Sequence, residues 1–280
     1  MNAVNTGNAN AGRAADPTTS APIYQVDAFA NRRFAGNPAA VVLLEHFPDD
    51  VAMQAIAAEN NLAETAFVVP HASDYRLRWF TPRVEVPLCG HATLASAAVV
   101  MERIEPARER VVFDTASGPL TVDRTPSGYR MDFPARPTMP SGARAQLAGA
   151  LGAAALEDVQ ANAFVYLVRL ASVQAVRALN PDMAALAALD RSGVIVTAAD
   201  GSDYDFVSRY FAPAKGVPED PVTGSAHCAL APYWAARLGK TAFRAHQASP
   251  RGGELRCRLI GERVELEGSC VFYLEGRVTF

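Results

Sequence analysis

The chain has 280 residues, enough for two domains, and half of them are hydrophobic while 20% are charged, as in most folded globular proteins. The net charge is −3, and the sequence contains no block of Lys or Arg, which argues against nucleic-acid binding. The longest apolar runs, Leu94–Met101 and Ala229–Ala236, are far shorter than the ~20 residues that span a membrane. The four cysteines form no CxxC pair and indicate no disulfide framework, so a reducing, cytoplasmic location is expected.

The N-terminal region is predicted to begin with a disordered extension. Residues 1–21 are rich in Ala, Asn, Gly and Thr, and they show neither a periodic apolar pattern nor the apolar core of a secretory signal. Apolar runs, a turn at Gly36-Asn37-Pro38 and an acidic helix start then predict a strand from Ile23, a strand at Ala39–Leu44, a helix at Pro48–Glu59 and a strand at Thr65–Val69.

An internal repeat follows. The first copy reads SDY at 73–75, WFTP at 79–82, VP at 86–87 and GHA at 90–92, and the second reads SDY at 202–204, YFAP at 210–213, VP at 217–218 and GSA at 224–226. Each copy leads into an Ala-rich helix, and only the loop before the glycine differs in length, with two residues in the first copy and five in the second. This ordered set of elements predicts a duplicated unit and an α+β fold of two similar domains related by a pseudo-twofold axis.

The duplication divides the chain into two halves. We expect the N-terminal half to cover residues 22–125 and the C-terminal half residues 126–268, with a linker near Thr125–Ser127, where a Pro and a Gly interrupt the pattern after a strand at Gly118–Asp123. The C-terminal half is predicted to contain several strands and two helices, at Ala145–Ala155 and Pro181–Leu189.

Both copies place a glycine at the start of a helix, Gly90 before His91 and Gly224 before Ser225. A helix N-terminus carries unpaired N–H groups and a partial positive charge, so it attracts anions. Two such termini facing one cleft between the halves would suit a small carboxylate and the enolate or oxyanion formed from it. The alternative is structural: the glycines permit tight turns, and His91 and Ser225 cap the helices.

Three more residues are candidates for acid–base chemistry. Glu64 lies between a polar turn and an apolar strand, where partial burial would raise its pKa, although a glutamate beside a strand is commonly an exposed surface residue. Asp220 lies in the longer second loop, where carboxylates commonly form turns. Cys89 adjoins Gly90 at a helix start, where the pKa of a thiol can be lowered, whereas the other three cysteines are expected to pack in the core.

Motifs for metals and nucleotides are missing from the sequence. The five histidines are scattered and form no HxxxH pair, so no metal site is predicted. GxGxxG and GxxxxGKS/T do not occur, so nucleotide binding is not indicated, and GxSxG does not occur either.

Four segments carry a likeness to a known family: VDAFANRRFAGNPAAVVL (26–43), NNLAETAFV (60–68), PLCGHATLASA (87–97) and EDPVTGSAHCALAPYW (219–234). In sequence and order they resemble the phenazine-biosynthesis isomerase-like family, and the likeness covers nearly the whole chain. The resemblance implies the diaminopimelate-epimerase-like fold, in which each domain is a β-barrel-like sheet around a central helix and the active site lies between the domains. It also implies that the last strand, residues 269–280, returns to the first domain, and that the protein is a homodimer.

The resemblance also assigns roles to residues. The acid–base glutamate of the family corresponds to Glu64. The polar residues that hold the substrate correspond to His91 and Asp220, and the substrate-binding glycines and the serine after the second correspond to Gly90, Gly224 and Ser225. In the name-giving enzyme, trans-2,3-dihydro-3-hydroxyanthranilate is isomerised without a cofactor when a proton leaves C3 and returns elsewhere on the ring. We therefore expect a cofactor-independent isomerase of a small cyclic or amino carboxylic acid.

Two departures from the family leave alternatives open. Ala63 precedes Glu64 where the phenazine enzyme has a serine, which would change the substrate that is held. Epimerases of this fold use a thiol in each half, but here the counterpart of Cys89 is Thr223, which argues against a two-thiol racemase, although both residues are expected to contact the substrate. Because related proteins with Cys in one half and Thr in the other resemble dehydratases, a Cys89-assisted epimerase or dehydratase is an alternative. A carboxylate-binding protein without turnover is another.

Overall fold

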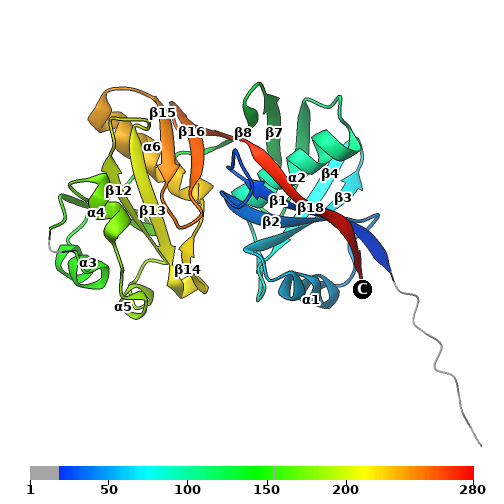
Figure 1. Ribbon diagram of the computed structural model, residues 1–280, viewed down its shortest axis with the longest axis horizontal. Coiled ribbons are helices and arrows are strands. Elements are labelled where there is room, and N and C mark those ends of the chain that lie inside the picture. The colour runs from blue at the N-terminus through cyan, green and yellow to red at the C-terminus, as the bar shows by residue number, and fades with distance from the viewer. Residues whose placement is uncertain (1–18, 154) are drawn as a thin grey trace, which may run out of the picture.

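The structure, a computed structural model that describes residues 19–153 and 155–280, has two halves side by side (Figure 1). The first half contains, in order, β1 (Ser20–Ala28), β2 (Asn37–Leu43), α1 (Asp50–Asn60), β3 (Glu64–His71), β4 (Asp74–Phe80), β5 (Glu85–Val86), α2 (Gly90–Val99), a π-helical turn (Val100–Ile104), β6 (Arg110–Asp114), β7 (Leu120–Thr125) and β8 (Gly128–Pro134).

The second half continues the chain with shorter elements around a longer helix. It contains β9 (Met139–Pro140), α3 (Arg144–Leu151), β10 (Asp158–Ala161), β11 (Val165–Arg169), α4 (Val173–Ala178), α5 (Met183–Ala187), β12 (Gly193–Ala199), β13 (Phe206–Ala212), a 3₁₀ turn (Pro213–Lys215), β14 (Val217–Asp220), α6 (Gly224–Leu238), β15 (Ala242–Gln247), β16 (Gly253–Ile260), β17 (Arg263–Gly268) and β18 (Cys270–Thr279).

The two halves repeat one strand topology, which confirms the duplication and the α+β class predicted from the sequence. In the first half β2 runs parallel to β3, β3 antiparallel to β4, and β4 parallel to β6. In the second half β11, β12, β13 and β15 pair in the same order and directions. The short strands β5 and β14, which pair with β4 and β13, each lead into the long helix of their half, α2 or α6.

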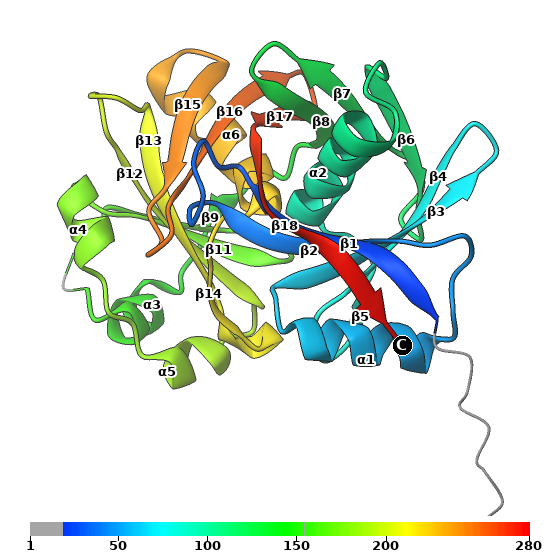
Figure 2. The same ribbon diagram turned by 45° about the vertical axis from the view of Figure 1, so that its right-hand side comes forward.

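The long helices α2 and α6 form the centre of the core (Figure 2). Every residue of α2 after Gly90 is buried, and its sequence GHATLASAAV consists mainly of small side chains, so strands pack closely around it. α6 carries larger buried residues, among them Trp234, whose ring stacks on that of Phe206 with centroids 5.8 Å apart. The two helices contact each other, and one continuous apolar cluster surrounds both.

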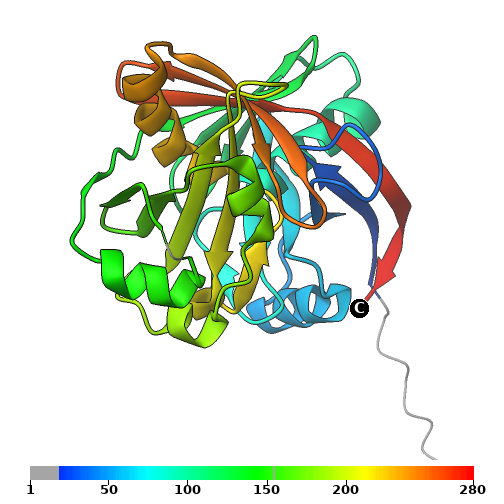
Figure 3. The same cartoon turned by 60° about the vertical axis from the view of Figure 1, so that its left-hand side comes forward.

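The remaining α-helices cover outer faces of the sheet. α3, α4 and α5 pack on the second half (Figure 3). Successive side chains of β12 point to opposite faces of the sheet there, so that Val194 and Val196 face the outer helices and Ile195 faces the apolar cluster around α6. α1 covers β3 in the first half, and it begins where the Asp49 side chain accepts a hydrogen bond from the Ala52 N–H.

Two strands connect the halves. β8 pairs with β7 on one edge and with β17 of the second half on the other. β18 leaves the second half and runs antiparallel to β1, from the Ala28–Cys270 pair to the Ser20–Thr279 pair (Figures 1 and 2). These pairings hold the two halves in one continuous sheet.

Several element boundaries differ from those expected. Residues 1–18 of the extension expected at 1–21 lie outside the described residues, but Ser20 and Ala21 belong to β1 because they pair with the last strand. The predicted linker at Thr125–Ser127 lies at the β7–β8 hairpin turn, which Thr125 and Gly128 close.

The outer helices also differ from the prediction. The helix expected at Ala145–Ala155 ends at Leu151, because Gly152 adopts a left-handed conformation with φ 63°. The helix expected at Pro181–Leu189 is shorter, beginning after the Asp182 N-cap, and the six-residue α4 was not predicted at all. Among the described residues, no helix is long and apolar enough to span a membrane.

Candidate active site

Glu64 is positioned by the end of α1 and the start of β3. α1 ends at Asn60, Asn61 turns the chain in a left-handed conformation with φ 47°, and Asn60 Nδ2 donates to Thr65 Oγ1 at 3.1 Å. β3 then starts at Glu64, which lies opposite Ala39 on the parallel strand β2. Because β2 and β3 are parallel, Glu64 lies at the same end of these strands as Asn37, the first residue of β2.

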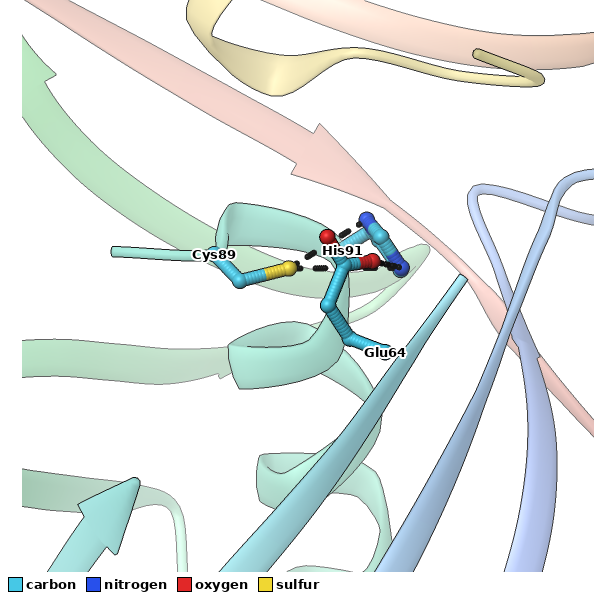
Figure 4. A group of neighbouring side chains, drawn as sticks. All are labelled: Glu64, Cys89 and His91. Carbon is cyan, nitrogen blue, oxygen red and sulfur yellow. Dashed lines mark hydrogen bonds and ion pairs between the residues drawn. The ribbon is translucent and has the colours of Figure 1, made fainter. Parts of the chain in front are cut away.

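Cys89 and His91 come from the N-terminus of α2 and meet Glu64 there (Figure 4). His91 Nε2 lies 3.1 Å from Glu64 Oε2, within ion-pair distance, although the two atoms form no aligned hydrogen bond. Cys89 Sγ lies 3.5 Å from His91 Nδ1 and 4.0 Å from Nε2. A carboxylate, an imidazole and a thiol are thus collected at one helix end.

Asn37 connects this group to the second half of the protein. Its Nδ2 lies 3.2 Å from His91 Nδ1, and it donates to Asp220 Oδ1 at 2.7 Å and to the Val222 carbonyl at 3.0 Å. Asn37 is completely buried, so these contacts are not exchanged for water. The polar chain Glu64–His91–Asn37–Asp220 therefore runs from one half into the other.

The loop that carries Asp220 is held by buried polar contacts. Thr223 Oγ1 donates to Asp220 Oδ2, and the fully buried Gln247 accepts from the Thr223 N–H at 2.9 Å. Gln247 Nε2 also donates to the Asp220 carbonyl at 2.8 Å. Because both backbone groups of the loop are fixed, the Asp220 carboxylate has little freedom to turn away from Asn37.

Gly90 and Gly224 begin α2 and α6, as predicted, and their N-cap residues Cys89 and Thr223 make no side-chain capping bond. Neither glycine has a positive φ, and a Cβ on Gly90 would meet no atom closer than 4.0 Å, so the backbone does not require glycine there. Gly224 is buried, and a Cβ on it would lie 3.4 Å from the Leu266 side chain. Ser225 is exposed in the first turn of α6.

The ionisation of Glu64 differs from the prediction. Burial raises the pKa of Glu64, but the charge and hydrogen bonding of His91, with a contribution from Cys89, outweigh burial, so the net pKa is lowered and the expected rise was wrong. Burial lowers the pKa of His91, but Cys89 and Glu64 raise it more, and the net pKa lies well above its usual range. At neutral pH Glu64 is therefore a carboxylate, and this carboxylate favours the protonated form of His91 beside it.

Two further groups have pKa values set mainly by burial. Burial raises the pKa of the Cys89 thiol to about 11, and the Glu64 charge adds to this, so the lowered pKa expected at the helix start was wrong. Burial also raises the pKa of Asp220 to about 6, although His91, Thr223 and Asn37 partly oppose the rise. Cys89 is thus a neutral thiol at neutral pH, whereas Asp220 gains or loses its proton near pH 6.

Asn37 was not among the predicted site residues, although it lies in one of the family segments, because its position next to a glycine and a proline indicated only a turn. Gln247 was not among them either, because it has no distinctive sequence context. A third missed feature is a clasp between the halves, in which Arg251 donates to the buried Asp27 at 2.8 Å and to the Gly36 carbonyl at 2.9 Å. Asn37 and Asp27 share one weak sequence signal, a polar residue next to an apolar strand, whereas Gln247 and Arg251 lie in polar segments.

The group at the helix end also has the composition of a metal site. Glu64, Cys89 and His91 each offer a ligand atom, and these atoms lie within 4.8 Å of one another. The sequence did not predict a metal site, because only Cys89 and His91 are neighbours in the chain.

A separate hollow of about 590 Å³ is lined by Arg130 of β8 and otherwise by residues of the second half. Charged residues dominate its lining, including Arg130, Arg244, Arg256, Arg258, Glu265 and Glu267. Neither Glu64, His91 nor Asp220 lines it, so the polar chain and not this hollow locates the candidate chemistry.

The sequence likeness extends over the residues that build this site. The profile of the phenazine biosynthesis-like protein family matches residues 26–276. The chain belongs to this family. Within the phenazine biosynthesis-like family, it is 53% identical to an uncharacterized isomerase of Pseudomonas aeruginosa, over 91% of this chain and 97% of that protein.

Solved structures agree with the family and the fold. A PhzF-family phenazine biosynthesis protein from Enterococcus faecalis superposes with a TM-score of 0.88 and 44% identity, covering 93% of this chain and 99% of that one. A hydroxyproline epimerase from Agrobacterium vitis, solved with bound trans-4-hydroxy-L-proline, shares the fold alone, with a TM-score of 0.59 and 12% identity. The resemblance and the epimerase-like fold expected from the sequence are thereby confirmed.

Proposed function

We propose that this protein is a cofactor-independent isomerase of a small cyclic or amino carboxylic acid, and that Glu64 transfers the proton. The observation that carries the proposal is the polar chain from Glu64 through His91 and Asn37 to Asp220, which joins the two halves at the N-termini of their central helices. Relatives within the family that bear the name isomerase support it.

The chemistry begins with Glu64 as a base. Its lowered pKa keeps it a carboxylate at neutral pH, so it can accept a proton from a carbon of the substrate. The electron pair left on carbon delocalises toward the substrate carboxylate. Return of the proton from Glu64 to a different carbon moves the double bond and gives the isomer, with no atoms gained or lost.

His91 supports this transfer through both ring nitrogens. In its neutral form, Nε2–H faces Glu64 and Nδ1 accepts from Asn37, whereas in its protonated form Nδ1–H faces the Cys89 sulfur. His91 can therefore gain or lose a proton while both nitrogens keep a polar neighbour. An imidazolium here stabilises negative charge on Glu64 and on the substrate.

The substrate carboxylate is proposed to bind at the helix N-termini. The N–H groups at Gly90 and Gly224 lack a side-chain cap and carry the positive end of the helix dipole, so they favour an anion and the enolate formed from it. Thr223, which donates to Asp220, is proposed to contact the substrate from the second half.

The test is proton NMR in D₂O with trans-2,3-dihydro-3-hydroxyanthranilate. The wild-type protein is expected to remove the C3–H signal and produce an isomer, Glu64→Gln to lose at least about 100-fold in rate, and the exposed Glu59→Gln to match the wild type. If the wild type leaves this compound unchanged, hydroxyproline and amino acids follow as substrates. Turnover that survives Glu64→Gln would refute the assigned base.

Cys89-assisted epimerisation or dehydration is the second candidate function. The observation in its favour is the Cys89 sulfur, 3.5 Å from His91, where a neutral thiol can donate a proton to a bound substrate. Cys89→Ala separates the candidates, because isomerisation through Glu64 is expected to survive it and epimerisation or dehydration is not. A binding protein without turnover would bind a carboxylate but incorporate no deuterium.

We also propose that the protein is a homodimer, as the family resemblance implies. Gel filtration with light scattering measures this directly. A mass of one chain would refute it.

A further inference from the structure

We propose that Glu64, Cys89 and His91 form a binding site for a soft divalent cation, with Zn²⁺ as the probe. The bound ion would contact the same side-chain atoms that are proposed to transfer the proton. The three residues come from the start of β3 and the N-terminus of α2, and their ligand atoms lie within 4.8 Å of one another. Carboxylate oxygen, thiolate sulfur and imidazole nitrogen are all ligands that Zn²⁺ accepts.

The spacing of the donor atoms fits one tetrahedral ion. With Zn–N and Zn–O near 2.1 Å and Zn–S near 2.3 Å, a tetrahedral site separates nitrogen from oxygen by about 3.4 Å and nitrogen from sulfur by about 3.6 Å. In the protein, His91 Nε2 lies 3.1 Å from Glu64 Oε2 and 4.0 Å from Cys89 Sγ. Shifts of a few tenths of an ångström would fit these two distances, and the Glu64 oxygen and the Cys89 sulfur, which lie within 4.8 Å of each other, would be about 3.6 Å apart at a tetrahedral ion.

The surroundings also favour an ion at this point. Glu64 Oε2 is buried, and its 3.1 Å contact with His91 Nε2 is not an aligned hydrogen bond, so an ion that replaces the Nε2 proton could take the oxygen as a ligand. Cys89 and His91 are buried, which shields the site from competing water and restricts their rotamers. Three protein ligands leave a fourth position open, as in sites where zinc also contacts a small anion.

Occupation of the site would oppose proton transfer. Coordination uses the Glu64 oxygen that would take the proton, and it releases to solvent both the thiol proton of Cys89 and the proton on His91 Nε2. Inhibition by Zn²⁺ therefore rests on the proposed function, but binding itself does not. A failed isomerase assay would leave the binding proposal standing.

The test is titration of the full chain, stripped with a chelator, by Zn²⁺ in a calorimeter and by Co²⁺ in an absorbance spectrometer. We expect one ion per chain, with micromolar or tighter affinity, and a thiolate-to-cobalt charge-transfer band. Cys89→Ala is expected to abolish the band and weaken Zn²⁺ binding at least about 100-fold, and Glu64→Gln to weaken it at least about 10-fold. Cys257→Ala, which removes a buried thiol of the second half, is the control and should bind within about twofold of wild type.

Two results would overturn the proposal. One is the absence of saturable binding at one ion per chain in the wild type. The other is binding that persists unchanged in both Cys89→Ala and Glu64→Gln, which would place the ion elsewhere on the protein. Because the wild-type cobalt spectrum reports thiolate ligation by itself, the test stands even where a variant does not fold.

Discussion

Replacing Asp220 by Asn is expected to stabilise the folded protein at neutral pH while it abolishes turnover. Burial raises the pKa of Asp220 from 3.8 to about 6, so the folded state binds a proton more tightly than the unfolded state does. As the pH rises from 3.8 to about 6, ionisation of Asp220 increasingly favours the unfolded state. Above about pH 6 the loss of folding free energy approaches its full value. Asn has nearly the same shape without the charge.

The size of the effect follows from the two pKa values. Linkage gives a penalty of about 1 kcal/mol at pH 4.5, rising to about 3 kcal/mol at pH 8. The variant can keep the pairing with Asn37 through its amide oxygen and with Thr223 through its amide nitrogen, because the Thr223 hydroxyl can turn to accept. Its stability advantage over wild type should therefore grow with pH, up to about 3 kcal/mol.

Urea unfolding monitored by the fluorescence of the buried Trp79 and Trp234 measures this from pH 4.5 to 8. Asp203→Asn, at an exposed aspartate of the second half, is the control and should show no pH-dependent difference from wild type. A variant that is less stable than wild type at pH 8, or whose advantage does not change with pH, would contradict the reasoning. Turnover of Asp220→Asn above about 1% of the wild-type rate would contradict the proposed role of this carboxylate in holding the substrate.

Three other substitutions test separate parts of the structure. Gly90→Ala should leave the urea midpoint nearly unchanged, because a Cβ meets no atom within 4.0 Å, but should lower turnover at least about 10-fold by blocking the helix end; full activity would remove this glycine from the binding site. Gly36→Ala should cost more than about 2 kcal/mol in unfolding free energy, because its φ is 66° and a Cβ would lie 2.2 Å from a carbonyl oxygen of β1. Gly118→Ala, with φ 91° and open space, is the matched control and should cost about 1 kcal/mol; equal losses would show that packing at Gly36 is unimportant. Arg251→Met should cost about 3 kcal/mol, because it leaves the buried Asp27 without its cation, and Arg251→Met with Asp27→Asn should recover part of that loss in the same urea assay.

The sequence by itself was sufficient to predict the duplication and the family. Local patterns carry this information: the SDY, Phe-x-Pro, Val-Pro and Gly elements recur in order, and each is built from residues close together in the chain. The helix starts at Gly90 and Gly224 were predicted for the same reason, since they follow a strand and precede an Ala-rich run. The end of α3 at Leu151 was not predicted, because it depends on the left-handed conformation of Gly152. The pairing of Ser20 with Thr279 was not predicted either, because its partner strand comes from the far end of the chain.

Only the tertiary structure decided how the site residues act on one another. Glu64 was predicted to have a raised pKa from its burial alone, but the direction reverses because His91 lies 3.1 Å away. Asn37 was read as a turn residue, yet it bridges His91 and Asp220, which come from different halves of the chain. Sequence patterns report which local structure a segment adopts, whereas Coulombic interactions and burial depend on distances between segments. Those distances are set only when the two halves pack together.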